Sequence, residues 1–135
     1  MKILSLASKL SLQSPKLVDK FKNDEIMVIS PLDDNINAKF IKCEIGAMSY
    51  VLALIGLEFG FDGEFWSDLD EGELSGESNI GEEELPQICE FIKNCDICII
   101  SDEIFETNKS SSQAILSLLK SKIGFKIVKI NGDEI

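Results

Sequence analysis

The sequence contains neither arginine nor histidine, and this excludes much of the ordinary chemistry of binding and catalysis. Arginine supplies the planar fork that binds phosphate or carboxylate through two parallel hydrogen bonds. Histidine is the commonest general base near neutral pH and the commonest metal ligand. Catalysis would therefore fall to cysteine, lysine, aspartate or glutamate, and no pair of these residues has a spacing typical of an active site. We expect no catalytic activity of this chain alone.

Positive charge is also scarce, because 24 acidic residues outnumber 13 lysines and leave a formal net charge of −11 at pH 7. Such a charge repels a phosphate backbone, so nucleic acid is not an expected partner. Long apolar runs are missing as well. The longest, Tyr50 to Leu57, is far shorter than the roughly 20 residues that span a bilayer. The first ten residues, MKILSLASKL, superficially resemble a signal peptide, but serines interrupt the apolar stretch. We interpret them as the first strand of a cytoplasmic protein.

The 135 residues are 44% hydrophobic, which is enough to build the core of one domain. Short runs rich in β-branched residues alternate with segments of helical periodicity, and Ser14 with Pro15 is typical of a helix start. We predict a single α/β domain over residues 1–135, a three-layer αβα sandwich with a mostly parallel, Rossmann-like sheet. The predicted strands are Ile3–Ala7, Glu25–Ser30, Phe40–Ile45, Ile97–Ser101 and Phe125–Ile130, and the main predicted helices are Met48–Phe59, Glu82–Asn94 and Ser111–Ser121.

Two of these helices carry clear packing patterns. The helix from Met48 is apolar nearly all round, which is expected of a central helix buried on most sides. In the helix from Ser111, we expect Ile115, Leu118 and Leu119 to point inward.

Residues 62–84 have a different character, with ten acidic residues, four glycines and no lysine. We predict an acidic surface excursion at about 61–80, solvated and held by the aromatic pair Phe65 and Trp66. A metal-binding or partner-binding loop is the alternative, although the spacing of calcium ligands is missing.

The four cysteines do not form a recognisable ligand set. Cys95 and Cys98 have the Cys-x-x-Cys spacing, but they follow a predicted helix and enter a strand, whereas redox pairs open a helix after a strand. The spacing of all four cysteines, with Cys43 and Cys89 included, matches no known pattern of iron-sulfur ligands. A zinc site would require distant segments to converge. We interpret all four as structural or incidental thiols.

The α/β pattern suggests two possible sites for a nucleotide or a phosphoryl group, but the residues present argue against both. Asp102 resembles the phosphorylated aspartate of a receiver domain, but the acidic pair that would hold magnesium is replaced by Leu6, Ala7 and Ser8. The serines that follow the first strand, Ser5, Ser8, Ser11 and Ser14, resemble a flavodoxin-type phosphate loop. No glycine occurs between Met1 and Gly46 to let the backbone approach a phosphate closely, so we interpret these serines as helix caps.

Three stretches resemble the G subunit of bacterial NADH:quinone oxidoreductase, respiratory complex I, within its large domain related to molybdopterin oxidoreductases. They are EIMVISPLDDNINAKFIKCEIGAMSYVLALI (Glu25–Ile55), ELSGESNIGEEELPQICEFIKNCDICIISDEIF (Glu73–Phe105) and AILSLLKSKIGFKIVKI (Ala114–Ile130). The resemblance covers most of the chain in the same order, and it rests on pattern and scattered identities.

The resemblance implies a degenerate nucleotide site at Ser30, Pro31, Leu32, Gly46, Ala47 and Met48. In molybdopterin oxidoreductases the first turn reads Asp-Pro-Arg, and here Ser30 and Leu32 replace the aspartate and the arginine. The second turn reads Pro-Gly-Thr-Asp in that family, and here only Gly46 is kept. A dinucleotide in such a site would leave polar groups unpaired, so Asp33 and Asp34 are expected to be turn residues rather than ligands.

The resemblance further implies a cofactor-free structural and interaction domain, with iron-sulfur clusters elsewhere in the parent subunit. Expected partners are other parts of that subunit and other peripheral-arm subunits, in the cytoplasm at the inner membrane. The chain is then expected to be a piece of the large domain. The alternative is a flavodoxin-like or receiver-like module that binds a nucleotide, a flavin or a phosphoryl group.

Overall fold

The structure is a computed structural model that describes residues 1–101 and 109–135. Five parallel strands form one sheet in the order β3-β2-β1-β4-β5. This confirms the predicted α/β, Rossmann-like class, with a sheet that is parallel throughout these five strands. The strands are β1 (Lys2–Ser5), β2 (Glu25–Ser30), β3 (Lys39–Lys42), β4 (Ile97–Ile100) and β5 (Lys126–Lys129).

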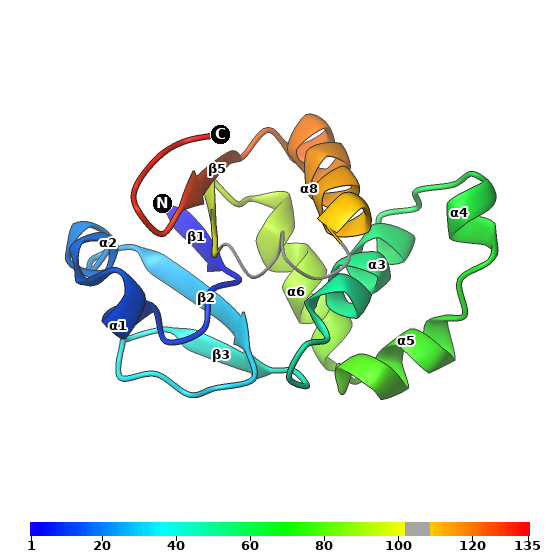
Figure 1. The fold of residues 1–135 in the computed structure, drawn as a ribbon, viewed down its shortest axis with the longest axis horizontal. Coiled ribbons are helices and arrows are strands. Elements are labelled where there is room, and N and C mark those ends of the chain that lie inside the picture. The colour runs from blue at the N-terminus through cyan, green and yellow to red at the C-terminus, as the bar shows by residue number, and fades with distance from the viewer. Residues whose placement is uncertain (102–108) are drawn as a thin grey trace.

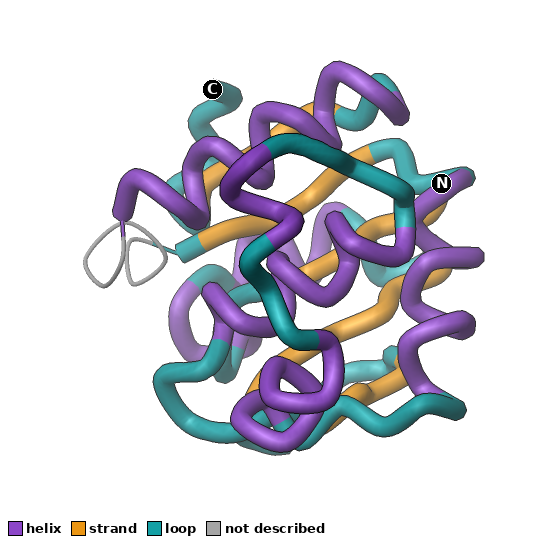
Figure 2. Tube along the Cα trace, turned by 90° about the vertical axis from the view of Figure 1, so that its right-hand side faces the viewer, coloured by secondary structure: helices purple, strands orange, loops and turns teal. Residues whose placement is uncertain are grey.

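Helices cover both faces of the sheet. The helices are α1 (Leu10–Gln13), α2 (Pro15–Lys20), α3 (Met48–Glu58), α4 (Glu64–Ser67), α5 (Glu71–Ser78), α6 (Glu84–Lys93) and α8 (Lys109–Ile123). Figure 1 shows α1 and α2 on one side of the sheet, and α3, α6 and α8 on the other. In Figure 2 the helices of this second side lie in front of the strands. The result is the predicted αβα sandwich.

The strands bury side chains on both faces because each face has its own helices. Along β2, Met27 and Ile29 join the core under α3, α6 and α8, whereas Ile26 and Val28 join the core under α1 and α2. Such continuous apolar strands are typical of parallel sheets. The helix α3 is buried at every position from Val51 to Gly56, as predicted, because α5, α6 and α8 all pack against it.

The predicted acidic excursion contains two helices that were not predicted. It forms α4 and α5, which lie farthest from the sheet in Figure 1. Asp70 starts α5 by accepting hydrogen bonds from the amides of Gly72 and Glu73. The aromatic anchor is Trp66, which is 7% exposed, whereas Phe65 is 47% exposed and packs edge-on against it. The segment is therefore held by one buried aromatic residue rather than by the pair.

The contact between Trp66 and α3 depends on a glycine. A Cβ atom at Gly56 would lie 2.3 Å from Cη2 of Trp66, well inside van der Waals contact. Only glycine at this position lets the indole ring lie against the helix backbone. The sequence places Gly56 in an otherwise apolar helical run, where glycine is costly unless such a close approach requires it.

Helix α8 differs from its predicted packing at one position. Ile115 and Leu119 are buried as expected, but Leu118 is 43% exposed and Leu116 is buried in its place. The helical period explains the difference, because residues 115, 116 and 119 share a face from which residue 118 points away.

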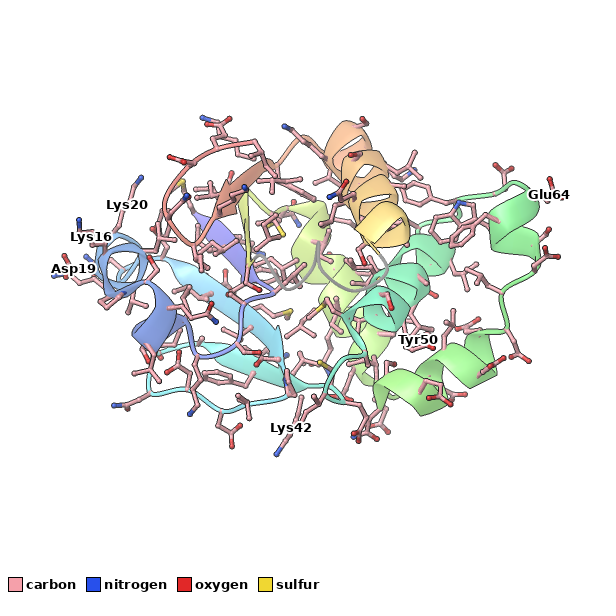
Figure 3. The ribbon with its side chains drawn as sticks, viewed as in Figure 1. Lys16, Asp19, Lys20, Lys42, Tyr50 and Glu64 are labelled. Atoms are coloured by element: carbon pink, nitrogen blue, oxygen red, sulfur yellow. The ribbon has the colours of Figure 1, made fainter. Side chains whose placement is uncertain are left out.

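Charge is distributed unevenly along this fold. Residues 43–92 contain 13 acidic residues and no lysine, so the other 85 residues carry all 13 lysines and the remaining 11 acidic residues. Figure 3 shows Lys16 and Lys20 at the α2 end of the molecule and Glu64 at the opposite end, on α4. The net charge of −11 therefore arises in the segment that runs from the end of β3 to α6.

Candidate functional site

The resemblance places the degenerate nucleotide site at two neighbouring turns, and the structure brings these turns to the same edge of the sheet. Residues Ser30 to Leu32 follow β2, and residues Gly46 to Met48 lie between β3 and α3. Ser30 pairs with Lys42 across the two strands. This is the carboxyl edge, where open parallel sheets bind their ligands.

The Ser30 side chain closes its own turn. Its hydroxyl donates to the Leu32 carbonyl at 3.1 Å, accepts from the Leu32 amide at 3.1 Å, and lies 3.2 Å from the Ser8 hydroxyl. Ser30 is 4% exposed, Pro31 is half-buried, and Leu32 is 44% exposed to solvent. Ser30 therefore holds the backbone between the strand and the acidic turn in place.

The second turn is built mainly by backbone and apolar contacts. Gly46 has φ +75°, a conformation that favours glycine, and a Cβ there would meet nothing within 4 Å. Ala47 is buried at the N-cap position of α3 and makes no side-chain cap hydrogen bond. Met48 is half-buried and packs against the core under α3. These three residues position the start of α3 and present no charged side chain.

The turn after β1 contains the most specific polar contact at this edge. The Ser11 amide donates to Asp34 Oδ2 at 2.9 Å, and the Ser11 hydroxyl donates to Oδ1 of the same carboxylate. The Asn35 amide adds a third hydrogen bond at 2.7 Å. Lys9 adopts φ 50°, so a lysine takes the left-handed conformation that glycine usually supplies in such turns.

The electrostatics of Asp34 favour its charged form. Partial burial acts to raise its pKa, but the hydrogen bonds from Ser11 and Asn35, together with the charge of Lys9, lower the pKa below the ordinary value. Asp34 is therefore ionised at neutral pH. Its carboxylate engages an amide of the turn that follows β1, and amides of the first βα turn bind phosphate in dinucleotide-binding folds.

The interpretation of the serines that follow the first strand needs correction. The serines after the first strand were expected to be helix caps, but Ser8 contacts Ser30 and Ser11 contacts Asp34. Ser5 is part of β1 and accepts from the Ala7 amide at 3.3 Å, and Ser14 occupies an N-cap position without a side-chain cap hydrogen bond. The serines join the turns at this edge to one another because β1 and β2 are neighbouring strands.

The sequence identified the individual residues at this edge but not their pairing. Asp34 was expected to be a turn residue, and Ser8 and Ser11 were considered for a phosphate loop. Their contacts cross 22 and 23 residues and depend on the register in which Lys2 pairs with Glu25. No local signal in the sequence specifies that register.

The four thiols are buried and unpaired with one another. Burial raises the pKa of the Cys43 and Cys95 thiols to about 11 and that of Cys89 to about 12, and it raises the pKa of Cys98 still further. A thiol with such a pKa is protonated at neutral pH and is a poor nucleophile. This agrees with the interpretation of the cysteines as structural. Across residues 1–101 and 109–135, no cluster of three or more cysteine or acidic residues has a geometry suited to a metal ion.

Asp102, the aspartate that resembles a receiver phosphorylation site, lies outside the described residues. Among the helices that the structure describes, none has both the length and the apolar character required to cross a bilayer.

Comparison of the sequence with protein-family models finds no match, and comparison with curated proteins finds no similar sequence.

Proposed function

We propose that this chain is a cofactor-free structural and interaction domain of the G subunit of NADH:quinone oxidoreductase. In this proposal it acts as a scaffold and contact surface in the peripheral arm, in the cytoplasm at the inner membrane. It takes part in respiratory electron transport only through the whole complex, whose iron-sulfur clusters lie elsewhere. The resemblance of three ordered stretches to that subunit is the basis for naming the complex.

The single observation that carries the cofactor-free part of the proposal is the contact between Ser11 and Asp34. The Ser11 amide, in the turn where related α/β folds bind phosphate, already donates to a carboxylate of the chain at 2.9 Å. A phosphate at this turn would have to displace an ionised side chain and would be repelled by it. The charge of Lys9 already acts on Asp34, and the chain has no arginine or histidine to add to it.

The interaction part of the proposal is supported by apolar side chains that the fold leaves incompletely covered. Ile97, Val128 and Ile130 lie on the sheet face that carries α1 and α2, and all three are only half-buried. Ile45, beside the second turn, is 82% exposed. Such side chains suit a domain that packs against other parts of a larger assembly.

The proposal is tested by affinity purification of the natural full-length protein that carries this sequence, tagged in its source organism. We expect the other peripheral-arm subunits of complex I to co-purify in near-equal amounts. The same tag on an unrelated acidic α/β protein serves as the control. Recovery of the tagged protein without those subunits would contradict the proposal.

A further inference from the structure

A cavity of about 510 Å³ lies among α3, α5 and the start of α6, within the acidic segment. Its walls combine apolar side chains with two carboxylates, and it is lined by Leu54, Glu71, Gly72, Ser75, Ile80, Gly81, Glu82 and Leu85. This volume is within the range of cavities that bind small molecules or single side chains. The cavity lies outside the turns of the degenerate nucleotide site, and no role has yet been given to it.

The floor and the rim of this cavity differ in chemistry. Leu54, Ile80 and Leu85 are buried residues that form an apolar floor. Glu71 and Glu82 are exposed and stand at the rim. An apolar floor beside carboxylates fits a side chain with an alkyl stem and a cationic head, because the stem packs while the head stays near the charge.

The chain supplies no cation to this rim within the part that the structure describes. The ion pairs among the described residues join Asp24 to the N-terminus, Lys2 to Glu25, Asp19 to Lys22, and Glu90 to Lys93. None involves Glu71 or Glu82, and no lysine occurs between Lys42 and Lys93.

Three polar groups beside the cavity are already engaged, whereas no described hydrogen bond or ion pair involves the carboxylates of Glu71 and Glu82. Asp70 caps α5, Glu84 accepts from the Gly81 amide at 3.1 Å, and the Ser75 hydroxyl donates to the Ile80 carbonyl. The cavity walls are therefore fixed by internal hydrogen bonds. A pocket with fixed walls is better suited to one defined cationic side chain than a flexible stretch of acidic residues would be.

We propose that this cavity receives a lysine or arginine side chain from a basic segment of a partner protein. The inference rests on the proposed function, since it assigns one contact point of the interaction domain. The charge of the surrounding segment, 13 acidic residues against no lysine, would also attract such a partner over longer range.

The test uses backbone amide NMR of the full chain, with Gly72 and Gly81 as reporters in the cavity wall and Gly63 and Gly132 as reporters elsewhere. The probe is an acetylated and amidated pentapeptide with a central arginine between glycines and serines. The same peptide with citrulline, which has no charge, is the ligand control. We expect saturable shifts at Gly72 and Gly81 with the arginine peptide and none with the citrulline peptide.

The double variant Glu71→Gln, Glu82→Gln removes both carboxylate charges at the rim. The control is the double variant Asp62→Asn, Glu64→Gln, which makes the same change of net charge outside the cavity. Loss of two exposed ion pairs should weaken binding by roughly five- to tenfold in the first variant, with little change in the second. Equal weakening in both variants, or shifts of equal size at Gly63, would overturn the proposal. Shifts at Gly72 and Gly81 that depend on protein concentration without peptide would also contradict a foreign partner.

The same variants separate this inference from the proposed function. If complex I subunits co-purify equally well with the wild-type protein and the Glu71→Gln, Glu82→Gln protein, and the peptide does not bind the wild-type chain, the cavity assignment fails while the proposed function stands. If the peptide binds at the cavity but no complex I subunit co-purifies, the proposed function fails while the cavity assignment stands.

Discussion

Residues 43–92 and the rest of the chain use their carboxylates in different ways. In the sheet-forming part, Asp24 pairs with the N-terminal amine, Asp34 accepts from Ser11, and Asp96 accepts from the Lys2 amide at 2.8 Å. In residues 43–92, Asp70 and Glu84 hold local backbone amides, and the only described ion pair is that between Glu90 and Lys93. The carboxylates named in the sheet-forming part hold the fold together, whereas most of those in residues 43–92 are left for solvent or for a partner.

The two parts of the molecule are also held together by different contacts. The sheet-forming part is held by strand pairing and by apolar contacts on both faces. The outer helices α4 and α5 depend on a few buried residues that reach α3, of which Trp66 is the largest. The acidic part should therefore respond more strongly to single changes at its anchor than to changes of surface charge.

The largest expected effect comes from Trp66→Ala. Removing a buried tryptophan from the core costs about 3–5 kcal/mol of unfolding free energy. Urea denaturation followed by far-UV circular dichroism measures this loss. A loss of less than about 1 kcal/mol would show that Trp66 is not the anchor of the acidic segment.

The next largest effect is expected from Gly56→Ala, which tests the contact between Trp66 and Gly56. Because an added Cβ would lie 2.3 Å from the indole ring, Gly56→Ala should destabilise the protein by about 1–3 kcal/mol. In the Trp66→Ala background the cost should fall below about 1 kcal/mol, because the indole ring is gone, only the Phe61 ring lies close at 3.2 Å, and alanine favours a helix over glycine. Denaturation of the four proteins of this double-mutant cycle measures both values. An equal cost in both backgrounds would contradict the contact.

A smaller effect is expected at the carboxyl edge. Asp34→Ala should cost about 1 kcal/mol at pH 7, because it removes a charged acceptor of several hydrogen bonds. The folded-state pKa of Asp34 is lowered, so this stability is present above the unfolded-state pKa and is lost as the pH falls through the folded-state pKa. The difference between the wild type and the variant should therefore shrink in acid. Asp33→Ala, at an exposed neighbouring residue, is the control and should leave stability unchanged at both pH values.

The smallest effect concerns repulsion within the acidic segment. Raising sodium chloride from low concentration to about 0.5 M should increase stability by roughly 1 kcal/mol or less, because salt screens repulsion between exposed carboxylates. Thermal denaturation across a salt series measures this change. A variant with Asp62→Asn, Glu64→Gln and Asp68→Asn should depend less on salt. Stability that falls as salt rises would indicate that attraction, rather than repulsion, dominates.

The sheet and its central helix could be predicted because their signals are local. Glu25–Ser30 was predicted with its observed bounds, since β-branched residues build the strand and Pro31 ends it. The helix from Met48 was predicted to within one residue, because its apolar residues can be buried on all sides only by a central position.

The acidic helices and the polar contacts of the carboxyl edge could not be predicted in the same way. The sequence Asp70-Glu71-Gly72-Glu73 carries a capping signal for α5, but the high density of acidic residues favoured a solvated excursion. The contact of Ser11 with Asp34 depends on strand register and on the left-handed conformation of Lys9, and neither is specified locally. The exposure of Phe65 and the burial of Trp66 follow from the space that Gly56 leaves.

The chain's own polar groups close the carboxyl ends of β1 and β2, and we expect no nucleotide to bind there. The most direct test is the melting temperature of the purified full chain with added ligand. The ligands are a guanine nucleotide, FMN, and a phosphoryl mimic with magnesium. A ligand that binds only the folded state at about 100 times its Kd would stabilise it by about 2.7 kcal/mol. We expect no change in melting temperature with any of the three ligands, and a clear rise with any one of them would show that the edge binds it.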